Sequence, residues 1–330
     1  MKTLVTGAGG FIGSAVVRQL LAQGREVRAT LAPGEVDSNL AGLDLEVVPL
    51  DVRDAAACAR AVAGCDVVYH LAAIYALWLP DDTVMHAVNV EGTKNVLFAA
   101  FHAGVRKVVH TSSIAAIGVP PPGQLADETF AFNHWRGGNA YIRSKYVSDL
   151  DARRLATMGL PVVIVCPAFP FGERDRGPTP TGRFIVEALH RRVPGITGGG
   201  FCAVDVEDVA ACHLAAEARG VVGERYIAGG HNVTYTEFYG EVTRAAGLPP
   251  ITRRLPDVAV MAAAWLMEAR ARRGGSPPRI TVKSARYALA TAWYDASKAR
   301  RELGMPRTPL AQTIARAVAW FRAAGMAPAS

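Results

Sequence analysis

The sequence has few cysteines and histidines, and neither residue type shows the spacing of a disulfide, redox or metal site. Five cysteines are spread over 330 residues, without a C-x-x-C pair. This odd number and spacing exclude a disulfide scaffold and a redox dithiol, and predict reduced thiols in a cytoplasmic protein. The eight histidines include no H-x-x-x-H pair, so we predict no metal site.

Long apolar runs and strong charge are also missing. The longest apolar helix candidate, residues 258–267, is too short to span a bilayer. The chain begins directly with a strand, which predicts that no signal peptide is present. The formal net charge is +7, and basic and aromatic residues do not alternate as in a nucleic-acid surface. We therefore expect neither an integral membrane segment nor a nucleic-acid partner.

One stretch leaves an alternative open. Residues 258–273 place apolar residues before Arg270, Arg272 and Arg273. This pattern fits a helix that lies on a membrane surface. An ordinary helix that covers the substrate site is the favoured interpretation.

A glycine turn stands at the start of the chain. Residues 2–6 form a short apolar run typical of a central strand. Gly7, Gly10 and Gly13 follow, and then apolar residues at helical spacing. Strand, glycine turn and helix bind a dinucleotide pyrophosphate, because glycines admit the phosphate and the helix N-terminus stabilises its charge. G-x-x-G-x-x-G alone is a weak signal, so the prediction depends on this context. The alternative is a glycine turn without a ligand.

Strands and helices alternate through the first half of the chain. Apolar runs predict strands at residues 2–6, 26–31, 45–50, 66–70, 106–111, 161–165 and 225–228. Helical patterns lie between them, at 54–62, 83–102 and 139–158. Strands that are apolar throughout indicate a parallel sheet covered on both faces. Right-handed crossovers then make the fold class α/β, a doubly wound Rossmann sheet.

The pattern changes in the second half. Glycine and proline cluster at residues 167–182 and 194–200, and helices are expected at 208–218, 236–246, 257–272 and 310–323. We predict a dinucleotide-binding domain in residues 1–168, with returns near 205–230 and 290–305. Residues 169–330 are predicted to form a smaller, mainly helical substrate region.

Tyr141 and Lys145 are the second signal. Four residues apart on a helix, they lie on one face. A neighbouring ammonium favours the phenolate and should lower the tyrosine pKa from its usual value of about 10. Such a tyrosine can exchange a proton with a substrate oxygen while hydride moves to or from a nicotinamide. Thr111, Ser112 and Ser113 end a strand where open α/β sheets bind ligands, and can hold that oxygen.

Together these motifs resemble the extended short-chain dehydrogenase/reductase family, within the NAD-dependent epimerase/dehydratase superfamily, over nearly the whole chain. The resemblance implies a catalytic triad of Ser113, Tyr141 and Lys145, with Lys145 also binding the nicotinamide ribose. Asn89 matches the family's helix asparagine, and either a structural or a proton-relay role is open. The implied cofactor contacts are Gly7, Gly10, Phe11, Ile12, Gly13, Asp51, Val52, Leu71, Ala72, Ala73, Thr111, Tyr141, Lys145, Pro167 and Phe169.

Two branches of the family are most similar. Residues 28–30 and 111–113 resemble the dihydroflavonol reductase and 3β-hydroxysteroid dehydrogenase group. Residues 77–78 and 178–183 resemble proteins labelled hopanoid-associated sugar epimerases. Ile117 stands where sugar-nucleotide epimerases usually carry tyrosine before glycine, and the Asp-Glu pair of the 4,6-dehydratases is missing beside Ser113.

These features predict an enzyme that reduces a ketone, or oxidises a secondary alcohol, on a small molecule with a sizeable apolar or aromatic part. The alternative is a nucleotide-sugar epimerase with tightly bound NAD, in which Arg174, Arg176 and Arg183 would bind the diphosphate. A non-catalytic dinucleotide sensor is disfavoured because the triad is complete. A homodimer is one candidate assembly. The expected substrate contacts are Tyr75, Trp78, Ser113, Ile114, Trp135, Phe171 and Arg183.

NAD(H) is favoured over NADP(H). The family's acidic position at the end of the second strand falls on Leu31, and the arginine of NADP-using reductases falls on Ala32, so neither marker is present. A 2′-phosphate would lack a cationic partner, because no Lys or Arg lies between Arg28 and Arg53. Arg28 is the counter-argument, although it should point elsewhere. Glu35, Asp37, Asp44 and Glu46 all lie in this interval.

Overall fold

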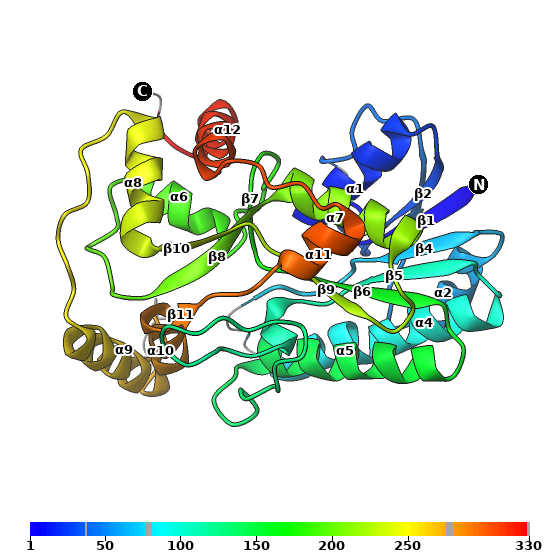
Figure 1. Ribbon diagram of the computed structural model, residues 1–330, viewed down its shortest axis with the longest axis horizontal. Coiled ribbons are helices and arrows are strands. Elements are labelled where there is room, and N and C mark those ends of the chain that lie inside the picture. The colour runs from blue at the N-terminus through cyan, green and yellow to red at the C-terminus, as the bar shows by residue number, and fades with distance from the viewer. Residues whose placement is uncertain (37, 77–78, 80, 275–279, 329–330) are drawn as a thin grey trace.

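The computed structural model describes residues 1–36, 38–76, 79, 81–274 and 280–328. Its main sheet has seven strands in the order β3-β2-β1-β4-β5-β6-β9 (Figure 1), all paired in parallel. The order reverses between β1 and β4, so the predicted doubly wound sheet is confirmed. The strands are β1 (Lys2–Thr6), β2 (Glu26–Leu31), β3 (Glu46–Pro49), β4 (Val67–His70), β5 (Lys107–Thr111), β6 (Val162–Pro167) and β9 (Arg225–Ala228).

Helices cover both faces of this sheet, as Figure 1 shows. One face carries α1 (Phe11–Ala22), α7 (Val206–Arg219) and α11 (Ser297–Leu303); the other carries α2 (Ala55–Val62), α4 (Thr93–His102) and α5 (Ala140–Thr157). The helix expected at 83–102 is instead divided into α3 (Asp82–His86), a π-helical turn η1 (Ala87–Gly92) and α4. Single π-helical turns are frequent at functional sites, and this one contains Asn89.

A second, smaller sheet is built around β8 (Gly200–Asp205), which pairs antiparallel with β10 (His231–Thr234). β7 (Phe169–Phe171) and β11 (Thr291–Ala292) pair in parallel with different stretches of β8. The sequence predicts helices here but not this sheet. Its short strands are spread over residues 169 to 292, so the sequence contains no local hairpin pattern that would predict their pairing.

Three helices pack around a second apolar core beside this sheet: α6 (Gly182–Leu189), α8 (Tyr235–Ala246) and α12 (Leu310–Ala323). The expected helices at 236–246 and 310–323 are confirmed, and α6 was not predicted. α7 was expected to begin at residue 208 and begins at Val206, because the Asp205 carboxylate accepts a hydrogen bond from the Glu207 N–H at 2.9 Å.

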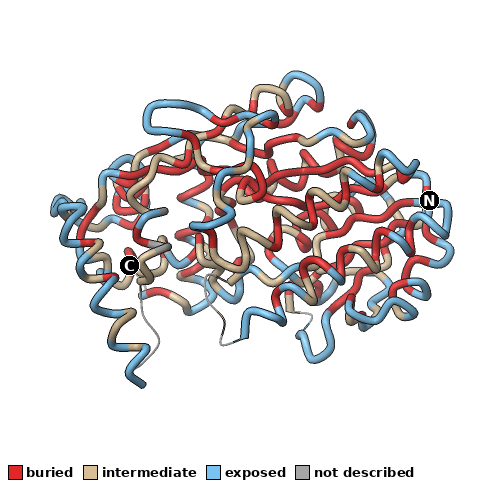
Figure 2. The backbone as a smooth tube through the Cα atoms, turned by 90° about the horizontal axis from the view of Figure 1, so that it is seen from below, coloured by how far each residue is buried: buried red, intermediate tan, exposed pale blue. Residues whose placement is uncertain are grey.

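The remaining helices, α9 (Asp257–Arg272) and α10 (Val282–Leu289), form a hairpin at one end of the molecule (Figure 1). Figure 2 shows mainly exposed and intermediate residues at that end, against a buried interior along both sheets. Among the described residues, no helix is long and apolar enough to cross a membrane.

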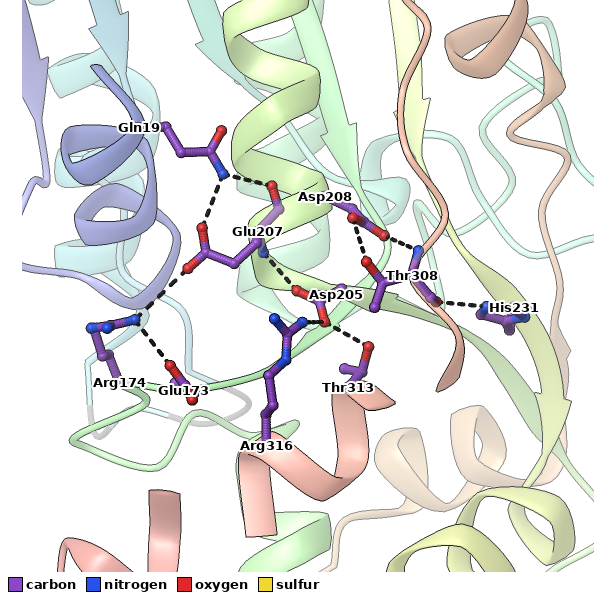
Figure 3. Close-up of polar contacts among 10 residues, drawn as sticks. All are labelled: Gln19, Glu173, Arg174, Asp205, Glu207, Asp208, His231, Thr308, Thr313 and Arg316. Atoms are coloured by element: carbon purple, nitrogen blue, oxygen red, sulfur yellow. Dashed lines mark hydrogen bonds and ion pairs between the residues drawn. The ribbon is translucent and has the colours of Figure 1, made fainter. Parts of the chain in front are cut away.

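A polar network joins the two cores at the start of α7 (Figure 3). The buried carboxylate of Asp205 accepts hydrogen bonds from Thr313 and Arg316 of α12. Asp208 accepts two from Thr308, at 2.6 Å from its N–H and 2.8 Å from its hydroxyl. The network therefore ties the C-terminal segment to the edge of the main sheet where β5 and β6 end.

Candidate active site

The glycine turn after β1 is sterically restricted to glycine at two positions. Gly7 has φ of +66°, and a Cβ there would lie 2.7 Å from the Ala72 nitrogen. A Cβ on Gly13 would lie 2.1 Å from the Gly7 oxygen. The turn is thus pressed against the predicted cofactor segment 71–73, which follows β4. It opens α1 at Phe11, whose first N–H groups and dipole suit a pyrophosphate.

Glu35 lies beside this turn, at the place expected for the adenosine ribose. Its Oε1 atom would be 2.7 Å from a Cβ built on Gly9. The Oε2 atom accepts a hydrogen bond from the Ala32 N–H at 2.9 Å, and the Glu35 N–H donates to the Ala32 oxygen at 2.9 Å. The count along the second strand placed the ribose-binding position at Leu31 and did not single out Glu35. The sequence feature that could have identified Glu35 is the turn at Gly34, which brings the chain back to the end of the strand.

Arg28 does point elsewhere, as expected. Its Nε donates to Glu46 at 3.0 Å, and its Nη1 donates to the backbone oxygen of Ala61, in α2, at 2.8 Å. Asp51 forms an ion pair with Arg53 at 2.6 Å, which holds the pKa of the Asp51 carboxyl below its usual value. Val52 is buried in the core.

Ser113, Tyr141 and Lys145 come together at the carboxyl end of β5. Ser113 caps the 3₁₀ turn Ile114–Ala116, and its Oγ accepts from the Ala115 N–H at 3.1 Å. Tyr141 is in the first turn of α5 and is hydrogen-bonded to Ser113. Lys145 is buried one turn later, and its Nζ donates to the Thr111 oxygen at 2.7 Å.

The pKa of Tyr141 shifts opposite to our expectation. Burial raises the pKa to about 12, and the hydrogen bond from Ser113 offsets only part of that effect. Burial also lowers the pKa of Lys145 to about 8. The expected lowering by Lys145 is wrong for this state, because desolvation of the phenolate dominates. Tyr141 is therefore a protonated phenol at neutral pH.

The residues next to the triad hold it in place. The Thr111 hydroxyl is hydrogen-bonded to the buried His213 ring at 2.8 Å, so its side chain faces α7 and only its carbonyl reaches Lys145. Ser112 donates to Asp149 at 2.7 Å. This arrangement distinguishes a structural Ser112 from Ser113, which faces Tyr141.

The side chain of Asn89 makes three hydrogen bonds that hold a loop in place. Its Oδ1 accepts from the Ile74 N–H at 2.7 Å, and its Nδ2 donates to the Ile74 oxygen at 3.0 Å and to Ser144 at 3.0 Å. The π-helical turn thus fixes the loop that follows β4 against α5. This loop carries Tyr75, whose ring centroid lies 4.9 Å from that of Tyr141.

The other expected substrate residues are dispersed. Trp135 is exposed and contacts Tyr146, with ring centroids 6.1 Å apart. Ile114 is buried in the main core. Phe171 is not a pocket residue: it is buried in the second core, 4.8 Å from the Phe238 ring, because β7 directs it between the sheet and α8. Trp78 lies outside the described residues.

Two predicted nicotinamide neighbours lie at the end of β6. Pro167 is its last residue, and Phe169 packs against both apolar cores. Arg183 is exposed at the start of α6 and donates to the Pro178 oxygen at 3.2 Å. In the described part of the chain, no group of three His, Cys, Asp or Glu residues could hold a metal ion.

An open, doubly wound sheet with this glycine turn and a Ser-Tyr-Lys site defines a class of dinucleotide-binding enzymes. The chain belongs to the NAD dependent epimerase/dehydratase family, whose model matches residues 3–229. The resemblance to extended short-chain dehydrogenases/reductases is therefore confirmed.

Its relatives carry the names of several different activities. The chain is 37% identical to a putative dihydroflavonol 4-reductase of Synechocystis sp., over 96% of this chain and 94% of that protein. It is 36% identical to sterol demethylase protein B of Methylococcus capsulatus, over 99% and 100% of the two chains. The crystal structure of a nucleoside-diphosphate-sugar epimerase from Pseudomonas aeruginosa superposes with a TM-score of 0.82 at 28% identity, covering 99% of each chain.

Proposed function

We propose that this protein is an NAD(H)-dependent reductase that converts a ketone on an apolar, ring-bearing substrate into a secondary alcohol. The observation that carries the proposal is Tyr141: a half-buried side chain with a desolvated, protonated phenol, hydrogen-bonded to Ser113 and one helical turn from Lys145. A phenol with a pKa of about 12 holds its proton at neutral pH and is suited to give it to a developing alkoxide.

Each triad residue has one role in this reaction. The nicotinamide, when bound, supplies the hydride that goes to the carbonyl carbon. The Ser113 hydroxyl donates a hydrogen bond to the carbonyl oxygen, and Tyr141 transfers its proton to that oxygen, which completes the alcohol. The Lys145 ammonium, held by the Thr111 oxygen, stabilises the phenolate that remains until solvent returns the proton.

An aromatic side chain beside Tyr141 supports an apolar substrate. The Tyr75 ring packs against the Tyr141 ring, with centroids 4.9 Å apart. Ligand sites lined in this way bury apolar surface and keep few polar groups for orientation. The relatives named for a dihydroflavonol and a sterol agree with this substrate class.

Two of the arginines that a nucleotide sugar would need are already engaged. Arg174 lies 3.4 Å from Glu173 and 3.8 Å from Glu207, and Arg176 donates to Asn39 at 3.2 Å. Binding a diphosphate there would first break these contacts. The epimerase remains the second candidate because the family and its structural relatives include epimerases.

Glu35 supports NAD(H) as the cofactor. Its carboxylate stands against Gly9 and can accept hydrogen bonds from ribose hydroxyls, whereas it would repel a 2′-phosphate. Glu35→Gln, which keeps the shape and removes the charge, should raise kcat/KM for NADPH relative to NADH by about tenfold or more. Glu46→Gln, a carboxylate already paired with Arg28 and Lys2, is the control. An unchanged cofactor ratio in Glu35→Gln would contradict this placement.

The reaction itself is tested with purified wild type and Tyr141→Phe. NADH consumption is followed with a panel of flavonoid and steroid ketones, and product formation with a panel of nucleotide sugars. The proposal expects ketone-dependent NADH oxidation in the wild type alone. Protein that arrives with NAD bound, and that interconverts nucleotide sugars without net NADH consumption, would establish the epimerase instead.

A further inference from the structure

The exposed face of α9 is apolar. Val258, Trp265 and Leu266 are 81%, 64% and 61% exposed, whereas only the small side chains of Val260 and Ala264 are buried along the helix. These two pack against Ala285 of α10. A surface helix ordinarily buries its large apolar residues and exposes polar ones, so α9 has the reverse arrangement.

The apolar residues on this side form one continuous stripe. Val258, Ala262, Trp265 and Leu266 are exposed and Ala269 is half-buried. Their spacings of four, three, one and three residues place them on one side of a helix. That side is opposite Val260 and Ala264. The hairpin lies at one end of the molecule (Figure 1), and the large side chains of the stripe are exposed there.

In the sequence, positive charge is concentrated in and around the segment that contains this hairpin. Residues 251–290 contain eight of the 36 Lys and Arg residues and two of the 29 Asp and Glu residues, so they hold +6 of the net charge of +7. Arg270, Arg272 and Arg273 are exposed at the end of the apolar stripe. The net charge of the rest of the chain is close to zero, so the total of +7 does not show that the positive charge is local.

We propose that α9 is a membrane-surface helix that docks the enzyme on anionic phospholipid. Trp265, Leu266 and Val258 insert among the acyl chains at the headgroup boundary, and the arginines contact lipid phosphates. Apolar area combined with cationic residues is the combination that binds a helix to an anionic interface. An exposed apolar stripe that ends in positive charge matches the acyl chains and the charge of an anionic lipid surface. This proposal goes beyond the proposed reaction and does not depend on it.

The hairpin is connected to the active-site loops. Leu289 ends α10 and leads directly to β11, and the Trp293 oxygen accepts a hydrogen bond from the Ala126 N–H at 3.1 Å. Residue 126 belongs to the same loop that carries Trp135. Docking through α9 therefore holds these loops near the lipid surface, where an apolar substrate is concentrated.

The test is co-sedimentation of the full chain with vesicles of phosphatidylcholine alone or mixed with phosphatidylglycerol. The wild type should sediment with the mixed vesicles, and salt should reduce its partition coefficient. Trp265→Ser/Leu266→Ser should lower this coefficient about tenfold or more, since it removes two large apolar side chains. Arg272→Gln/Arg273→Gln should lower it about fivefold per arginine.

Matched controls change equally exposed residues elsewhere. Met158→Ser removes a side chain that is 62% exposed just after α5, and Arg154→Gln/Arg192→Gln removes two exposed charges; neither should change partitioning. Thermal unfolding confirms that each variant folds, and Val258→Ser is a second apolar variant. Failure of the wild type to sediment, or unchanged binding by the α9 variants, would overturn the proposal. A dimer that Trp265→Ser/Leu266→Ser dissociates, without vesicle binding, would instead show that a second copy covers the stripe.

Discussion

The buried ammonium of Lys145 should destabilise the folded protein near neutral pH, where it is charged, relative to higher pH, where it is neutral. Burial lowers the pKa of its ammonium from 10.5 to about 8, so the folded state binds its proton less tightly than the unfolded state does. A depressed lysine pKa means that the unfolded chain holds more protons between these two values. The free energy of unfolding should therefore rise with pH across that window.

The size of this effect follows from the shift. A difference of roughly 2.5 pKa units corresponds to about 3 kcal/mol at 1.36 kcal/mol per unit. Lys145→Met keeps the length of the side chain and removes the charge. The stability of Lys145→Met relative to the wild type should therefore decline by about 3 kcal/mol between neutral pH and pH 10.5. At any one pH the variant also loses the hydrogen bond to the Thr111 oxygen, so the change with pH is the informative quantity.

The assay is urea unfolding of both proteins at several pH values. Lys94→Met, on the partly exposed face of α4, controls for the removal of a lysine. Groups that titrate in both proteins cancel in the difference. A difference between Lys145→Met and wild type that does not vary with pH would refute the assignment of Lys145 as a desolvated ammonium. Activity should be lost in Lys145→Met at every pH, which would show that the destabilising charge is retained for function.

Three further outcomes follow from the site. Tyr141→Phe should lower turnover about 10²–10⁴-fold while NADH binding persists; a variant that retains a tenth of wild-type turnover would exclude Tyr141 as the proton donor. Ser113→Ala should reduce turnover more than Ser112→Ala does, whereas Ser112→Ala should cost about 1–3 kcal/mol of stability because the buried Asp149 carboxylate loses one hydrogen-bond donor and keeps Arg153; a larger loss of turnover in Ser112→Ala would exchange their roles. Burial holds the pKa of His110 well below 6.5, so stability should fall as pH drops below 6.5, and His110→Phe should make this loss shallower by up to about 1.4 kcal/mol per pH unit. Parallel pH profiles of the two proteins would contradict that contribution.

Local patterns determined much of this protein from the sequence alone. The glycine turn, the apolar strands of the main sheet and the Tyr141–Lys145 pair depend on neighbours within a few residues. Strand and helix periodicity therefore predicted the doubly wound sheet, and the same motifs indicated the family that the comparisons confirm.

Contacts between distant segments decided the rest. In the second sheet, β8 pairs with strands that start at residues 169 and 291, and this pairing turns Phe171 into the core. The turn after β2 returns Glu35 to Gly9, which no fixed offset from a glycine predicts. Burial among residues of other elements raises the pKa of Tyr141, although the lysine spacing alone suggests the opposite. Burial and long-range pairing depend on the whole folded chain, and for that reason only the tertiary structure specified them.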